Sequence, residues 1–111
     1  MSTLFLPLIS IPIKSIFIYM DWTVSISKKV SKMISKLPRS IQKSLIALLA
    51  DIEDKGPVRG AWTNYGKLSP SRHHCHIKKG KPTYVAVWEV TDKKVQLVEV
   101  IYVGTYEKAP Y

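Results

Sequence analysis

The residues best suited to chemistry lie in one short stretch, RHHCHIKKGKPTYVAVWEV, which begins at Arg72 and ends at Val90. It contains all three histidines and the one cysteine of the chain, followed by three lysines and a strongly apolar run. Imidazole and thiolate groups bind transition metals, whereas histidines among cations suit the binding and cleavage of an anionic polymer. The stretch therefore allows two interpretations, a metal site or a cationic site for a phosphodiester.

The spacing favours the cationic site. If the stretch is a strand, alternate residues share a face, so His74, His76 and Lys78 point to one side. His73 and Cys75 point to the other. A structural zinc site needs four converging ligands, and the chain has no further cysteine or histidine. We therefore expect no metal and no cofactor, and we expect Cys75 to be a small core residue.

Composition sets the class of protein and the kind of partner. A chain of 111 residues is long enough for one domain with its own core. Its formal net charge of +9 indicates an anionic partner, either nucleic acid, an anionic membrane or an acidic protein. The single cysteine excludes an intramolecular disulfide, which suits a reducing cytoplasm. We expect a small cytoplasmic protein.

Residues 1–20 differ in composition from the rest of the chain. They are apolar, with two prolines and one charge, Lys14. The prolines and the central lysine argue against a membrane-spanning helix, and the charge lies on the wrong side of the apolar run for a signal peptide. We expect residues 1–19 to be a poorly packed extension, or to precede a true start at Met20, with the folded domain at 20–111.

Hydrophobic spacing predicts one strand and two helices in the first half of this domain. Residues 22–26 alternate between apolar and polar, as in a half-buried strand. Residues 28–37 have the apolar spacing of an amphipathic helix, with lysines on its solvated face. A second helix follows from Pro38 and ends at Gly56, a glycine before a proline. The two helices should form a hairpin with an apolar stripe toward the core.

The second half predicts a sheet. Glycines and prolines indicate a loop over residues 57–71, with at most one short strand near 62–67. Strands are expected at 72–79, 83–90 and 95–103, the last two joined as an antiparallel hairpin. The predicted fold is α+β: an N-terminal strand, a helix hairpin and a three-stranded antiparallel sheet. One face of the sheet should lie under the helices and the other should be open.

Three segments in this order carry a resemblance to a known family: MDWTVSISKKVSKMISKLPRSIQKSLIALLADIEDKGP, HCHIKKGKPTYVAVWEV and EVIYVGTYEKAPY. Over residues 20–111 they resemble the RelE/ParE superfamily of type II toxin–antitoxin toxins, and within it the RelE-like branch. The resemblance implies a cytoplasmic toxin that enters the ribosomal A site and cleaves mRNA there. It also implies a cognate antitoxin that wraps the toxin, operator DNA binding only through that complex, and no membrane partner.

The resemblance also implies catalytic roles. His76 and Lys78 stand where RelE-like enzymes carry two lysines that serve the phosphate and the hydroxyl. Tyr106 stands where relatives carry arginine or histidine, and Tyr111 takes the place of a late tyrosine. Both tyrosines are suited to stacking on an mRNA base or to handling a proton. These four residues are the predicted catalytic set.

A second set would bind the RNA backbone. Val85 stands where many relatives carry an arginine, which leaves a phosphate contact to be supplied by other cations. The predicted phosphate-binding residues are Arg72, His74, Lys79, Lys81 and Lys108.

The chemistry itself needs no metal. Attack of a 2′-hydroxyl on the adjacent phosphate requires a base, an acid and positive charge around the phosphorane. Two alternatives stay open from the sequence. One is a ParE-like inhibitor of DNA gyrase, which lacks the nuclease residues, and the other is a binding module for nucleic acid or antitoxin without chemistry.

Overall fold

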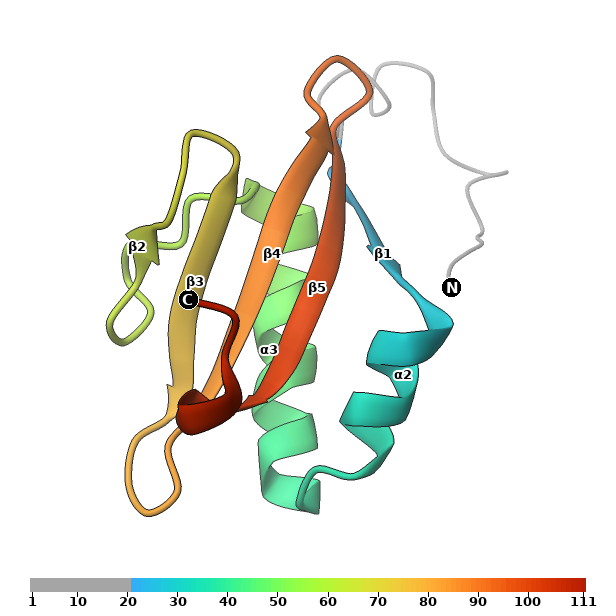
Figure 1. The fold of residues 1–111 in the computed structure, drawn as a ribbon. Coiled ribbons are helices and arrows are strands. Elements are labelled where there is room, and N and C mark those ends of the chain that lie inside the picture. Colours follow the sequence, from blue (N-terminus) through green and yellow to red (C-terminus); the bar gives the residue numbers. More distant parts are fainter. Residues whose placement is uncertain (1–20) are drawn as a thin grey trace.

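Two α-helices and a five-stranded sheet make up residues 21–111, the part of the chain that the computed structural model describes (Figure 1). The expectation for residues 1–19 lies outside the described residues. Within 21–111, no helix has the length and apolar character needed to cross a membrane.

The helices confirm the predicted hairpin, although the first helix ends two residues earlier than expected. Helix α2 spans Lys28–Ser35 and α3 spans Arg39–Lys55. The side chain of Ser27 caps α2 by accepting a hydrogen bond from the Val30 backbone N–H at 3.1 Å. Gly56 ends α3 with φ of 95°, a conformation that glycine adopts without strain.

The sheet contains more strands than the three expected. Its strands are β1 (Thr23–Ile26), β2 (Gly66–Lys67), β3 (Arg72–Lys78), β4 (Tyr84–Asp92) and β5 (Leu97–Thr105). They lie in the order β1-β5-β4-β3-β2. The N-terminal strand β1 pairs parallel to β5, while the other neighbours are antiparallel. The α+β class is confirmed, and both the N-terminal strand and the short β2 join the edges of the sheet.

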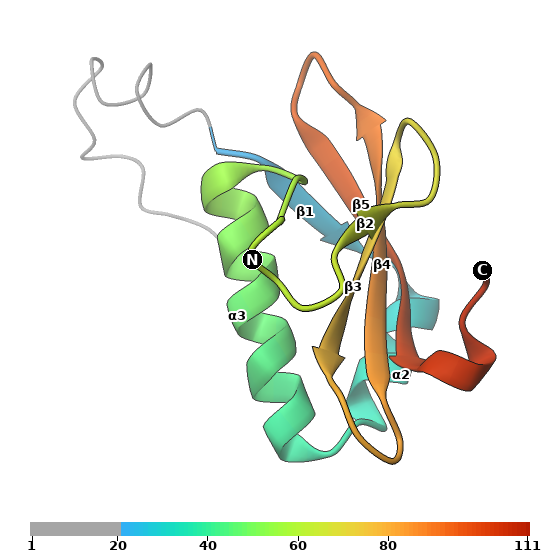
Figure 2. The same cartoon turned by 90° about the vertical axis from the view of Figure 1, so that its left-hand side faces the viewer.

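The core lies between the helices and one face of the sheet, which α3 crosses (Figure 2). The apolar stripe of α3 is fully buried, with Leu48 and Ile52 both 0% exposed. It meets Ala86 and Trp88 of β4, and the Trp88 indole N–H donates to the Pro57 carbonyl at 3.0 Å. The loop after α3 is thereby tied to the centre of the sheet.

The second face of the sheet is not open as predicted. Val85 and Val87 of β4 lie on this face, in register with His76 and His74, and both valines are 0% exposed. The C-terminal tail, which starts with a 3-10 turn at Tyr106–Lys108, crosses this face on the side away from α3 (Figures 1 and 2). The chain therefore uses its last residues to cover the face that the helices leave free.

The core predicts a large stability difference between two neighbouring positions of α3. Leu48→Ala leaves a cavity at a fully buried site and should lower the free energy of unfolding by about 2–5 kcal/mol. Ile46→Ala, at a residue that is 66% exposed, is the matched control and should change it by no more than about 0.5 kcal/mol. Urea unfolding followed by tryptophan fluorescence measures both. Equal effects would contradict the packing of α3 against the sheet.

Candidate functional site

Strand β3 divides the histidines as its alternation predicted. His73 and Cys75 are 2% and 0% exposed and face the helix side. The ring of His73 stacks nearly parallel on Trp88, with centroids 5.9 Å apart. Its Nδ1 shares a hydrogen bond of 2.7 Å with the Tyr65 hydroxyl. His73 is therefore a packed core histidine, and the histidines of the other face are the candidates for chemistry.

On the other face, His74 and His76 meet two tyrosines of the C-terminal tail. The ring of His74 lies 4.8 Å from that of Tyr111, and the ring of His76 lies 5.8 Å from that of Tyr106. The two tyrosines contact each other edge to face at 6.1 Å. These four residues, which we call the His–Tyr cluster, unite predicted site residues from β3 and from the tail.

Backbone contacts hold the tail in this place. The Tyr106 N–H donates to the Thr83 carbonyl at 2.8 Å, which anchors the start of the 3-10 turn beside β4. The Tyr102 hydroxyl donates to the Thr105 carbonyl at 2.7 Å. A Cβ at Gly104 would lie 2.6 Å from the Tyr102 hydroxyl oxygen, so a side chain there would displace the Tyr102 ring. The V-G pair before the tail thus makes room for the tyrosine that fixes the turn.

The predicted alternation fails at Lys78. A register shift between His76 and Lys78 places His76 opposite Val85 but Lys78 opposite Tyr84. Consecutive residues of β4 point to opposite faces, and paired residues share a face, so Lys78 does not share the face of His76. Lys79 lies close enough to His76 for its positive charge to contribute to lowering the pKa of that imidazole. This corrects the expected His76–Lys78 pair.

Burial keeps the histidines of the cluster neutral. It is the main cause of the lowered pKa of both His74 and His76. A proton on His76 would lower the pKa of His74 further, and the charge of Lys79 lowers that of His76 further. Within residues 21–111, the Nδ1 atoms of both rings are buried and have no hydrogen-bond partner. Burial raises the pKa of Tyr111, so its phenol keeps its proton. The cluster therefore offers neutral imidazoles beside a phenol that can donate a hydrogen bond.

Cys75 has no place in this chemistry. It is buried on the helix side, and burial raises the pKa of its thiol to about 12. A thiol with this pKa is not a nucleophile at neutral pH. Among the described residues, no group of three or more histidine, cysteine, aspartate and glutamate side chains is arranged to hold a metal ion.

The predicted phosphate-binding residues do not all gather at the cluster. Arg72 begins β3, about 13 Å along the strand from His76, and it pairs with Glu89 at 3.2 Å. Lys79 and Lys81 lie exposed in the connection from β3 to β4, and Lys108 lies exposed in the 3-10 turn. The lysines are free to move toward a ligand, whereas Arg72 is engaged elsewhere.

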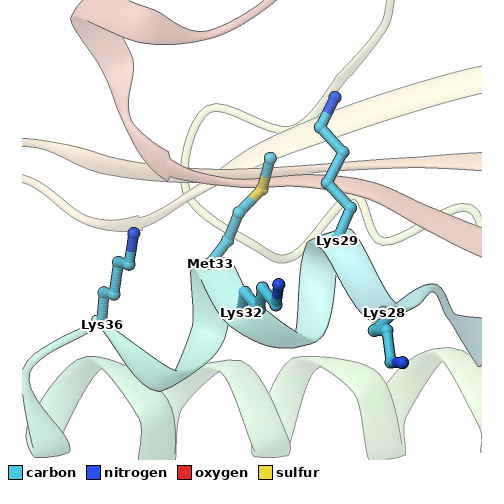
Figure 3. Close-up of a pocket in the computed structure, with 5 residues that line it drawn as sticks. All are labelled: Lys28, Lys29, Lys32, Met33 and Lys36. Carbon is cyan, nitrogen blue, oxygen red and sulfur yellow. The ribbon is translucent and has the colours of Figure 1, made fainter.

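A second basic feature was not predicted from the sequence. Three exposed lysines of α2 and a fourth at its C-cap line a groove of about 450 Å³ together with Met33, and Figure 3 shows their side chains. The lysines are Lys28, Lys29, Lys32 and Lys36. Within residues 21–111 none of them forms an ion pair. Lys28, Lys32 and Lys36 recur every four residues in the sequence, a spacing that is equally typical of the solvated face of a helix.

Comparison with known proteins identifies the fold. No protein-family model matches the chain, and no curated protein matches it. A RelE–RelB complex from the archaeon Pyrococcus horikoshii OT3 has a TM-score of 0.62 at 14% identity, covering 80% of this chain and 99% of that chain. The isolated E. coli RelE toxin has a TM-score of 0.58 at 25% identity, covering 80% and 88%. The E. coli RelBE toxin–antitoxin complex has 0.55 at 24%, covering 75% and 94%.

These similarities span almost the whole length of the solved RelE chains. The described part of this chain therefore has the fold of the RelE toxins, as the sequence resemblance predicted.

The buried His73 predicts a loss of stability in acid. Its pKa is lowered in the folded state from the ordinary value of 6.5, first by burial and then by Lys67, so the unfolded chain takes up its proton more readily. The contribution of neutral His73 to the free energy of unfolding is fully present above pH 6.5. It is lost as the pH falls through the lowered pKa of His73 in the folded state. Urea unfolding at pH 7.5 and at pH 5 should show this fall, and His73→Phe should reduce its slope. A slope unchanged by His73→Phe, as in the control Ile46→Ala, would contradict the assignment.

Proposed function

We propose that this chain is the toxin of a type II toxin–antitoxin system, an endoribonuclease that cleaves mRNA on the ribosome without a metal. The observation that carries the proposal is the His–Tyr cluster, which lies on the helix-free face of a RelE fold. A cluster of two imidazoles and two phenols has the groups that internal attack on a phosphodiester requires.

The geometry supports a division of labour within the cluster. The His76 side chain is partly exposed and its pKa is lowered, so its neutral ring is suited to accept the proton of the attacking 2′-hydroxyl. Tyr106 is 52% exposed and lies against His76, where it can stack on a base or hold the leaving group. Tyr111 and His74 form the second pair, in which the protonated phenol can donate to a phosphate oxygen.

Positive charge for the phosphorane must come from loops. Val85 occupies the position opposite His76 and is fully buried, so that strand position supplies no cation. Lys79 follows the strand directly, while Lys81 and Lys108 lie in the neighbouring connection and turn. Cations that surround a developing charge stabilise the transition state even without transferring a proton. We assign the phosphate contacts to these three lysines.

The proposal includes a protein partner. Two of the similar solved structures are complexes of RelE with RelB. The lysine-lined groove of α2 has an apolar contribution from Met33, which suits an acidic amphipathic segment that folds as it binds. We propose a cognate antitoxin with such a segment as the partner. The carboxylates of that acidic segment would also compete with RNA for the basic surface of the toxin.

Mutation of the cluster tests the nuclease. His76→Ala removes the proposed base and should slow cleavage of ribosome-bound mRNA by roughly 10²–10⁴-fold. Lys79→Ala should slow cleavage more than Lys78→Ala does, because the register shift places Lys78 on the sheet face opposite His76. The assay maps new mRNA 5′ ends with purified ribosomes. Lys94→Ala, an exposed lysine in the turn between β4 and β5, is the charge-matched control.

Three results would contradict the proposal or a part of it. Full cleavage by His76→Ala would remove the residue from the mechanism. DNA damage or altered supercoiling on induction of the chain in a bacterial host, with intact message, would place the protein with the gyrase inhibitors. If the parent chain neither cleaved mRNA nor damaged DNA, it would be a module that binds without chemistry.

The pH dependence separates a base from an acid. The folded-state pKa of His76 lies below 6.5, so its neutral form predominates from pH 7 upward. If it accepts the hydroxyl proton, the cleavage rate should be level between pH 7 and 8 and should fall as the pH drops below the lowered pKa. Single-turnover cleavage across this range measures the profile. A rate that rises as the pH falls would show instead that the protonated imidazole is the active form.

A further inference from the structure

A second cavity lies away from the His–Tyr cluster, on the helix side of the sheet. It has a volume of about 500 Å³ and is lined by the end of α3, the residue before β1, and the strands β2 and β3. Trp22, Gly56 and His73 contribute to its wall. Figure 2 shows these elements near the upper end of α3, whereas the C-terminal tail lies across the opposite face. The two sites are therefore separate.

The lining carries positive charge and no carboxylate. Lys55, Lys67 and Lys93 all contribute to it. Lys55 lies 3.6 Å from Asp51, but Lys67 and Lys93 form no ion pair with any residue in 21–111. The positive charge of Lys67 also contributes to lowering the pKa of His73. Two unpaired cations at a cavity whose lining holds no carboxylate favour an anionic ligand.

The cavity also has an aromatic wall in a fixed position. The Trp22 backbone N–H donates to the Glu53 carbonyl at 2.9 Å. Gly56 packs against the indole so closely that a Cβ there would lie 2.9 Å from the indole nitrogen. An indole beside lysines is the combination that binds nucleotides, because the ring stacks on a base while the ammonium groups meet the phosphate.

A buried polar group completes the wall. His73 is only 2% exposed, and its orientation is set by the Tyr65 hydroxyl and by stacking on Trp88. Since Tyr65 occupies Nδ1, the other ring nitrogen, Nε2, is the polar atom left for a ligand. A rigid polar group in an apolar wall is the usual source of orientation in a small-molecule site.

We propose that this cavity binds a nucleoside phosphate, with the base on Trp22, the phosphate at Lys67 and Lys93, and a hydrogen bond to His73. The ligand is either a free nucleotide or one nucleotide of an RNA strand. The site goes beyond the proposed nuclease and does not depend on it, because none of its residues belongs to the His–Tyr cluster.

Calorimetric titration of the full chain tests the site. The probes are adenosine 5′-monophosphate, a short single-stranded RNA and inorganic phosphate, at about 0.15 M salt to suppress non-specific attraction. The variant Lys67→Gln with Lys93→Gln should weaken nucleotide binding by about tenfold or more. The matched control, Lys43→Gln with Lys94→Gln, removes the same charge from exposed positions outside both the cavity and the α2 groove, and should have less than about a twofold effect. Trp22→Leu should weaken the nucleotide on the order of tenfold but leave inorganic phosphate unchanged.

The outcomes separate the sources of the ligand. Saturable binding of the monophosphate identifies a free nucleotide as sufficient, and binding of the RNA alone identifies a nucleotide within a strand. Either binding result supports the proposal if the Lys67→Gln, Lys93→Gln variant loses that binding and the control variant keeps it. The proposal is wrong if neither probe saturates, if the two double variants weaken binding equally, or if inorganic phosphate binds as tightly as the nucleotide. Circular dichroism of each variant ensures that a loss of binding is not a loss of fold.

Discussion

The arrangement of this molecule depends on burying the central strand β4 on both of its faces. Ala86 and Trp88 point toward the helices, and Val85 and Val87 point away from them, yet all four side chains are at most 1% exposed. Burial of apolar side chains is the main favourable term in folding, and it is incomplete if one face of this strand meets water. Helix α3 covers one face, and the C-terminal tail crosses the other. The position of the tail, and with it the His–Tyr cluster, follows from this requirement.

Much of the fold could be predicted because local patterns and tertiary packing agree. The apolar spacing along α3 is the spacing of its buried face, and Gly56 before Pro57 marks its end in both the sequence and the structure. The alternation in β3 correctly separated His73 from His74, because a strand turns consecutive side chains to opposite faces. The RelE fold was likewise predicted from the order of elements rather than from any single motif.

The misses have physical causes that lie outside local patterns. A single extra residue between His76 and Lys78 turns the side chains that follow it in β3 to the opposite face of the sheet. No residue type in the sequence predicts such a bulge. The parallel pairing of β1 with β5 joins segments more than seventy residues apart, as Ser25 with Glu99 illustrates. The covered second face did have a signal, because YVAVWEV is apolar without alternation, and such a run is typical of a strand buried on both faces.

The same burial limits where the candidate site can take its positive charge. A cation at position 85 would lie beside His76 on a strand, in a fixed position, but it would place a charge among fully buried side chains. Valine there stabilises the sheet and removes a preorganised contact to a phosphate. Lysines on the adjoining connection and turn can replace the charge, although each must lose side-chain freedom when it binds. The chain thus combines imidazoles and phenols placed by β3 and the tail with exposed lysines, so in the proposed nuclease an incoming RNA would have to order those lysines.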